Sequence, residues 1–303
     1  MPQVNVNGLD IEYESFGREG DPAILLIMGL ASQLTLWPEA LCSGLAARQF
    51  RVIRFDNRDI GKSTHLSDKG APDLAALMAR LLSGQPVEPP YTLNAMAADA
   101  MGLLDAIGVD RAHIVGASMG GMIAQLVAVH YPARTKSLVS IMSTTGRRDL
   151  PPAKPEAMAA IMTPPASLGR EDRIEGAVRI WRAIGSPGYP ASDAELRALA
   201  EREVDRGPYE PAGTARQMAA VIAAPPRNEI LKNVRAPTLV IHGADDPLVP
   251  VAGGEDTAAS IPGAELIINP GMGHDFTQAL TPIYLKQIGD FVSKVEARAK
   301  SGR

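Results

Sequence analysis

A five-residue motif, Gly116-Ala-Ser-Met-Gly120, most constrains what this chain can fold into. It follows an apolar run, Ala112 to Val115, and opens a stretch with helical periodicity that ends at His130. Gly-x-Ser-x-Gly between a strand and a helix is typical of a sharp turn that lifts the serine side chain above a sheet. Side chains two residues before and after the serine would collide there, which favours glycine at both positions. Ser118 is therefore the candidate nucleophile, at the positive end of a helix dipole.

Two other interpretations compete with this one. A dinucleotide-binding turn is also rich in glycine, but it would carry glycine where Ser118 stands. A glycine-rich turn without any chemistry is the remaining alternative, because short motifs also occur by chance. A serine nucleophile needs a base and an acid that orients the base, so residues further along the chain decide between these interpretations.

Short β-rich runs alternate with longer helical patterns, which is typical of a mainly parallel sheet covered by helices. The pair Asn7-Gly8 lies between two such runs and favours a tight antiparallel hairpin at the start. The pattern predicts an α/β fold with an eight-stranded, mostly parallel sheet. The expected strands are residues 4–6, 9–15, 23–28, 51–55, 112–116, 138–142, 238–243 and 264–268.

One long stretch, residues 146–233, interrupts this alternation. It contains no clear strand-like run and has helical patterns near residues 171–184, 194–204 and 212–221, separated by prolines. A helical insertion after the sixth strand is expected to cover one edge of the sheet. We therefore predict a core domain made of residues 1–145 and 234–303 and a helical cap, or lid, made of residues 146–233.

Composition excludes several classes of protein. The chain has 303 residues, 30 Lys and Arg against 34 Asp and Glu, and a formal net charge of −4, which disfavours nucleic-acid and anionic-membrane partners. The single cysteine, Cys42, excludes a disulfide framework and multi-cysteine metal sites. We expect neither metal nor cofactor. The first ten residues lack the features of a secretory signal, and the longest apolar run, Met218 to Ala224, is too short to span a bilayer. A cytoplasmic monomer or homodimer is expected.

The acid and the base expected for Ser118 come later in the chain, in the order Ser, Asp, His. The apolar run that ends at residue 243 is followed by Asp245 and Asp246. We choose Asp246 as the acid and keep Asp245 as the alternative, although turn aspartates are common without any catalytic role. Among five histidines, His274 lies in a glycine-containing loop between the last strand and the last helix, where the base is required. His113 and His242 lie in expected strands and are expected to be packed.

Two backbone N–H groups should stabilise the negative charge that develops on a carbonyl oxygen. One is that of Met119, which follows the nucleophile, and the other is that of Leu30, in the loop after the third strand. The residues expected to contact a substrate are largely apolar, which favours an uncharged, moderately hydrophobic ester. They are Leu34, Trp37, Met158, Met162 and Trp181.

The run from Arg54 to Ser63 is similar to the loop after the fourth strand in the α/β-hydrolase superfamily, where the usual pattern is Asp-x-Arg-Gly-x-Gly-x-Ser. Asp59 replaces the first glycine of that pattern, and Met28 precedes Gly29 where many relatives have histidine. In both respects the chain resembles the aclacinomycin methylesterase-like carboxylic ester hydrolases. The match runs from about residue 9 to residue 291. The resemblance implies the α/β-hydrolase fold, the triad and ester chemistry.

Other activities on this fold stay open. Ser118 speaks against the haloalkane dehalogenases and epoxide hydrolases, which use aspartate as the nucleophile. Carbon–carbon bond hydrolases and cofactor-free perhydrolases share the whole triad pattern, so the motifs do not separate them from esterases. A slow-turnover small-molecule receptor is an alternative from a different class, because a fold by itself does not determine function.

Overall fold

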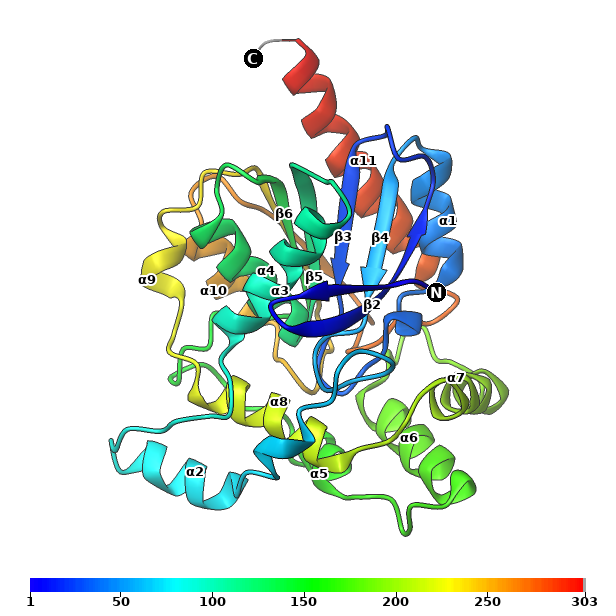
Figure 1. The fold of residues 1–303 in the computed structure, drawn as a ribbon, viewed down its shortest axis with the longest axis vertical. Helices are drawn as coiled ribbons and strands as arrows, with labels where there is room; N and C mark the ends of the chain where they lie inside the picture. The colour runs from blue at the N-terminus through cyan, green and yellow to red at the C-terminus, as the bar shows by residue number, and fades with distance from the viewer. Residues whose placement is uncertain (302–303) are drawn as a thin grey trace.

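The computed structural model describes residues 1–301 and contains one eight-stranded sheet (Figure 1). The strands lie in the order β1-β2-β4-β3-β5-β6-β7-β8. Strand β2 is antiparallel to both of its neighbours, and the other neighbouring pairs are parallel. This topology confirms the predicted α/β fold. The strands are Gln3–Val6 (β1), Leu9–Phe16 (β2), Ala23–Ile27 (β3), Arg51–Phe55 (β4), Ala112–Ala117 (β5), Thr135–Ile141 (β6), Thr238–Gly243 (β7) and Glu265–Asn269 (β8).

The predicted strands are all present. Strands β4 and β7 have the predicted bounds, and the other six differ by one residue at one or both ends, except at the start of β6. Strand β6 begins at Thr135, three residues before the predicted start, because the polar residues Thr135 and Ser137 pair with β5. An apolar run does not reveal such residues. Strand β8 is displaced by one residue, to Glu265–Asn269. It is an edge strand with several exposed side chains, so its sequence pattern marks its ends less clearly.

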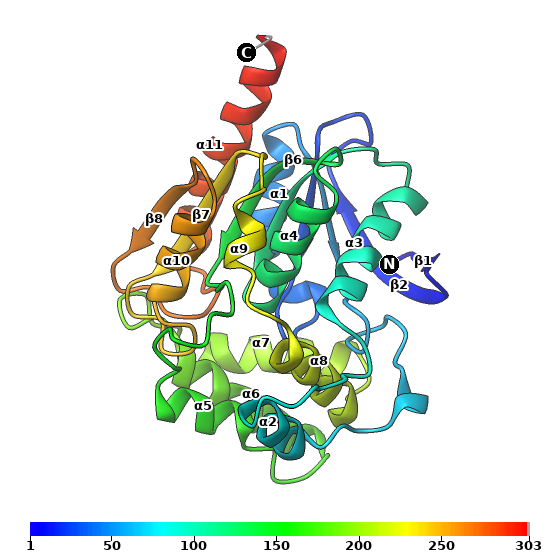
Figure 2. The same cartoon turned by 90° about the vertical axis from the view of Figure 1, so that its left-hand side faces the viewer.

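Helices cover both faces of the sheet (Figure 2). Helices α1 and α11 pack together on one face, and α3, α4, α9 and α10 lie on the other. Within residues 1–301, no helix combines the length and the apolar character needed to cross a membrane. The helices are Glu39–Ala47 (α1), Leu74–Leu82 (α2), Leu93–Ala106 (α3), Met119–His130 (α4), Pro155–Met162 (α5), Arg170–Ile184 (α6), Asp193–Arg206 (α7), Pro211–Ala223 (α8), Asn228–Leu231 (α9), Ala252–Ser260 (α10) and Thr281–Lys300 (α11).

The sheet separates two hydrophobic clusters. Successive side chains of a strand point to opposite faces. In β3, Leu25 and Ile27 pack with the cluster under α3 and α4, whereas Ile24 and Leu26 pack with the cluster under α1 and α11. All four side chains are fully buried. The continuous apolar run of this strand therefore follows from burial on both faces.

The chain between β6 and β7 forms helices α5 to α9. Helices α5 to α8 lie beyond the end of the sheet to which the arrows of β3 and β4 point (Figure 1). Helix α9 instead contacts α4 and α10, so the end of the 146–233 segment packs on the helical layer of the sheet. On this arrangement we propose that residues 146–233 act as a cap over the carboxyl ends of the strands.

Candidate active site

Ser118 occupies a strained turn between β5 and α4. Its backbone has φ 56° and ψ −122°, a left-handed conformation that costs energy in a residue other than glycine and is common at functional sites. A Cβ atom on Gly116 would lie 2.0 Å from the carbonyl oxygen of Gly120, and one on Gly120 would lie 2.0 Å from that of Ile27. The two glycines therefore permit the turn for the steric reason that the motif suggests.

His274 and Asp246 are brought together from two different loops. Nδ1 of His274 lies 2.7 Å from Oδ2 of Asp246, and both side chains are almost completely buried. Oδ1 of Asp246 accepts hydrogen bonds from the N–H groups of Leu248 (2.9 Å) and Val249 (2.8 Å). The carboxylate is thus fixed by its own turn. Because it faces Nδ1, it favours the imidazole tautomer that leaves Nε2 free to accept a proton.

Asp245 has a different environment. It is exposed, and its Oδ2 accepts a hydrogen bond from the N–H group of Gly271 at 2.8 Å. This contact braces the loop that carries His274. Of the two carboxylates between which the sequence left a choice, Asp246 is the one that contacts His274.

The other histidines near the sheet have structural environments. His242 is fully buried in β7, with Nε2 at 2.8 Å from the carbonyl oxygen of Val249 and 3.7 Å from Oδ2 of Asp246. His113 is also fully buried, between Ser137 and Glu296. Burial lowers the pKa of His242, and it lowers the pKa of His113 to about 4. Both imidazoles are therefore expected to be neutral at pH 7, as packed residues.

The loop after β3, residues 28–33, passes beside Ser118, and we refer to it as the oxyanion loop. A Cβ atom on Gly29 would lie 3.0 Å from Cβ of Ser118. Within residues 1–301, the N–H groups of Leu30 and Met119 donate to no other protein group. Both are therefore available to a ligand. The Ser118 hydroxyl likewise has no hydrogen-bond partner in the described part of the chain, so the structure joins Asp246 to His274 but not His274 to Ser118.

The five residues expected to contact a substrate lie in different environments. Leu34 and Trp37 are fully buried, and Trp37 packs against the Phe276 ring with a centroid distance of 4.8 Å. Met158 and Met162 are 42% and 54% exposed on α5. Trp181 lines a cavity of about 530 Å³ between the cap and the loop after β8. The wall of this cavity also includes Leu36, Leu199, Asp275 and Phe276.

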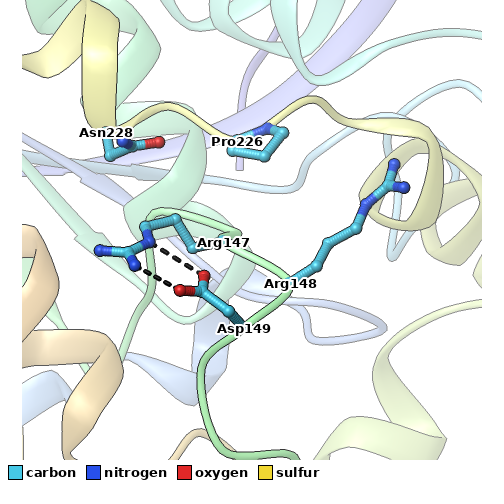
Figure 3. Close-up of a pocket in the computed structure, with 5 residues that line it drawn as sticks. All are labelled: Arg147, Arg148, Asp149, Pro226 and Asn228. Atoms are coloured by element: carbon cyan, nitrogen blue, oxygen red, sulfur yellow. Dashed lines mark hydrogen bonds and ion pairs between the residues drawn. The ribbon is translucent and has the colours of Figure 1, made fainter.

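A second hollow is an open groove of about 670 Å³ on the surface (Figure 3). It is lined by Arg147, Arg148, Asp149, Pro226 and Asn228. Nε of Arg147 donates to Asp149 at 3.0 Å, so this arginine is already paired within the groove. In the described residues, neither this groove nor the cavity beside Trp181 has Ser118, Asp246 or His274 in its lining.

The cap holds the loop that carries His274. The N–H group of His274 donates to the carbonyl oxygen of Ile184 at 2.8 Å, and that of Gly273 donates to Oγ of Ser186 at 2.7 Å. Ser186 in turn donates its N–H and its hydroxyl to the carboxyl group of Asp275. Burial raises the pKa of Asp275. Sequence reasoning missed these contacts, and no local pattern marks them, because the partners lie 87 to 90 residues apart.

The cap also contacts the loop after β4, through an ion pair with Asp59. Arg216 of α8 forms a bidentate ion pair with Asp59, at 2.9 Å and 2.7 Å, and both side chains are fully buried. Burial acts to raise the pKa of Asp59, but hydrogen bonds from Arg216 and from the N–H group of Leu66 hold it below its ordinary value. The aspartate that stands in place of a glycine thus serves as an attachment point for the cap.

Comparison with known proteins agrees with this geometry. A model of the alpha/beta hydrolase fold family matches residues 22–182, and a model described as TAP-like protein matches residues 214–296. The chain therefore belongs to the alpha/beta hydrolase fold family.

Individual relatives make the likeness more specific. Rhodomycin D methylesterase DauP of Streptomyces sp. (strain C5) is 28% identical over 284 residues, which cover 86% of this chain and 87% of the relative. 3-Oxoadipate enol-lactonase 2 of Acinetobacter baylyi (strain ATCC 33305 / BD413 / ADP1) is 26% identical, over 81% of this chain and 79% of the relative. The crystal structure of the enol-lactonase from Burkholderia xenovorans LB400 superposes with a TM-score of 0.69 at 21% identity and covers 96% of this chain and 100% of that one. The resemblance to methylesterase-like ester hydrolases is thereby confirmed.

Proposed function

We propose that this protein is a serine hydrolase that cleaves carboxylic esters through a triad of Ser118, His274 and Asp246. The observation that carries the proposal is the 2.7 Å contact between Nδ1 of His274 and Oδ2 of Asp246. The two residues follow β8 and β7, and Ser118 occupies a strained turn at the carboxyl end of β5. An imidazole held in this way has the orientation that a general base needs. Catalytic hydrogen bonds are often long in unliganded enzymes, so the unpaired Ser118 hydroxyl is compatible with this role.

The proposed reaction follows from the chemistry of these groups. Oγ of Ser118 attacks the ester carbonyl carbon while Nε2 of His274 takes the hydroxyl proton. Asp246 stabilises the resulting imidazolium. The alcohol leaves with the proton from His274, and an acyl group stays on Ser118. Water then attacks this acyl-enzyme by the same steps, which releases the acid and restores the serine.

The N–H groups of Leu30 and Met119 are proposed to receive the carbonyl oxygen as it becomes negative. Both are free of protein acceptors within residues 1–301, and the Leu30 donor follows Gly29, which lies against Ser118. Preorganised donors of this kind stabilise the transition state because they need no reorientation during the reaction. Removing one such donor typically lowers kcat by about 10²- to 10³-fold.

The substrate is proposed to be an uncharged, moderately hydrophobic ester. Two relatives act, by name, on a methyl ester and on an enol-lactone, and both substrates contain an oxygen ester. Trp181, Leu36 and Phe276 line the cavity next to the loop that carries His274, together with charged side chains such as Glu195 and Arg202. Because Ser118 is not in the lining of this cavity, all five side chains expected to contact the substrate keep this role only as part of the proposal. They are Leu34, Trp37, Met158, Met162 and Trp181.

The test is hydrolysis of p-nitrophenyl butyrate by the wild type and by Ser118→Ala. The proposal predicts turnover in the wild type and a loss of at least about 10³-fold in the variant, because the remaining groups supply no nucleophile. The matched control is Ser83→Ala, which removes a hydroxyl from the exposed end of α2 and should leave turnover unchanged. Equal rates for wild type and Ser118→Ala would overturn the proposal.

A further inference from the structure

Gln217 of α8 connects the cap to two loops at the candidate active site. Its side chain is fully buried. Oε1 accepts a hydrogen bond from the N–H group of Ala31 at 2.9 Å, and Nε2 donates to the carbonyl oxygen of Arg58 at 2.8 Å. Both ends of the amide are therefore used, which satisfies a polar group that would be costly to bury unpaired. One side chain of the cap thus bridges the oxyanion loop and the loop after β4.

Ala31 needs such support because of its backbone conformation. It has φ 56°, in the left-handed region that residues other than glycine rarely adopt. Strained conformations of this kind persist only where the surroundings fix them. Before Gly29, Nδ2 of Asn57 donates to the carbonyl oxygen of Met28 at 3.0 Å. The peptide groups immediately before and after the one that carries the Leu30 N–H are thus held by Asn57 and by Gln217.

Helix α8 is held in close contact with the core. The adjacent residue, Arg216, forms the buried ion pair with Asp59. One turn earlier, Gly213 lies so close to the loop after β4 that a Cβ atom would be 2.6 Å from the carbonyl oxygen of Asp59. This close approach and the ion pair leave the Gln217 amide little freedom to move relative to the oxyanion loop.

We propose that Gln217 is a positioning residue that aims the Leu30 N–H group at the developing oxyanion, so that the oxyanion hole is complete only when α8 is docked. This inference rests on the proposed function. Gln217 touches neither the substrate nor the reacting atoms, and it acts through Ala31. A donor must lie about 2.7–3.1 Å from the position of the oxyanion, so a small shift of the loop weakens transition-state stabilisation more than substrate binding.

The test uses Gln217→Met, which keeps the approximate volume of the side chain and removes both hydrogen bonds. With p-nitrophenyl butyrate we expect kcat to fall by about 10-fold or more, with KM changed by less than about 2-fold, because the lost interaction acts in the transition state. Gln125→Met is the matched control. Gln125 is also fully buried, but it bonds to Ser140, Thr144 and Arg227 rather than to the oxyanion loop, so kcat should be retained.

A transition-state probe separates positioning from general damage. A butyl trifluoromethyl ketone accepts Oγ of Ser118 at its carbonyl carbon; the hydroxyl proton passes to His274, and the carbonyl π electrons become the charge on oxygen. The inhibition constant for this ketone should rise in Gln217→Met by the same factor as kcat/KM falls. The corresponding methyl ketone, which forms little adduct, should bind wild type and variant equally. A merely structural defect would instead raise the inhibition constants of both ketones together, and that result would overturn the inference.

The two proposals fail in distinguishable ways. If the wild type neither turns over the ester nor binds the trifluoromethyl ketone more tightly than the methyl ketone, the proposed function is wrong, and this inference with it. If the wild type does both and Gln217→Met keeps its kcat and its affinity for the trifluoromethyl ketone, only the role of Gln217 is wrong. Gln217→Asn shortens the side chain by one methylene and keeps the amide, so it gives the same test if Gln217→Met does not fold.

Discussion

Asp59 and Arg216 form a fully buried, bidentate ion pair that joins the loop after β4 to helix α8 of the cap. Asp59 has φ 69°, so the chain accepts a left-handed aspartate at a position where glycine is the unstrained choice. Strain of this kind is retained when the surrounding contacts offset it. The ion pair provides such contacts and links helix α8 to the loop after β4.

Breaking this pair from one side should be severe. Arg216→Met is expected to lower the free energy of unfolding by about 3–5 kcal/mol, because it leaves the carboxylate of Asp59 buried without a cation. Asp59→Gly combined with Arg216→Met should regain most of that loss, since it also removes the charge and places glycine at a positive φ. Urea denaturation of the three proteins measures both quantities.

An exposed pair provides the control for this comparison. Arg170 and Asp205 are also bidentate, at 2.6 Å and 2.6 Å, but each side chain is 52% exposed. Arg170→Met should cost less than about 1 kcal/mol, because surface ion pairs contribute little. A double variant at Asp59 and Arg216 that is no more stable than Arg216→Met alone would contradict this account of the buried pair.

The two aspartates after β7 should differ strongly in their effect on activity. Asp246→Asn removes the carboxylate that faces His274 and favours the wrong imidazole tautomer, so kcat for p-nitrophenyl butyrate should fall by about 10³- to 10⁴-fold. Asp245→Asn changes an exposed residue that braces Gly271 and should cost less than about 10-fold. Steady-state kinetics measure kcat for the two variants. A larger loss of kcat in Asp245→Asn than in Asp246→Asn would show that Asp245 is the acid.

His113 should make the protein less stable in mild acid. Burial outweighs the nearby Glu296 carboxylate and lowers the pKa of His113 to about 4, against about 6.5 in an unfolded chain. Between these pH values the unfolded state binds the extra proton, so stability is fully present above pH 6.5 and declines as the pH falls towards 4. The contribution is about 3 kcal/mol. NMR titration of the histidine ring protons checks the premise, and a His113 ring that titrates near pH 6.5 would refute it.

The glycines of the Ser118 turn should tolerate no side chain. Gly120→Ala places a methyl group 2.0 Å from the carbonyl oxygen of Ile27, so the turn must open or the protein must unfold. We expect a loss of several kcal/mol in stability, on the order of the largest single-substitution effects, and a loss of esterase activity. Gly20→Ala is the control, because a Cβ atom at Gly20 has nothing within 4 Å. Equal thermal stability of the two variants would contradict the steric argument.

The sequence alone predicted much of the sheet, because buried parallel strands are continuous apolar runs and the turns between elements are marked by glycine and proline. The start of β6 was missed because Thr135 and Ser137 are polar residues within a strand. Ser118 was predicted from the Gly-x-Ser-x-Gly motif, and Asp246 and His274 from the chain order Ser, Asp, His together with their places after expected strands.

The sequence did not predict how the cap is attached to the core. Gln217 and Arg216 are polar residues on a helix, and such residues usually face solvent. Their partners, Ala31 and Asp59, lie 186 and 157 residues away, so no local pattern reveals the contacts. Trp37, an apolar side chain expected beside the substrate, is fully buried among core residues. Burial of an individual apolar residue depends on tertiary packing, which periodicity does not specify.

The central claim is that Ser118 is an activated nucleophile, and covalent labelling tests it most directly. Wild type and Ser118→Ala are treated with a fluorophosphonate, and intact mass is measured before and after. The account predicts a single adduct on the wild type, mapped to the peptide that contains Ser118, and none on the variant, because fluoride is displaced by an activated serine. An unlabelled wild type, or equal labelling of both proteins, would contradict the account.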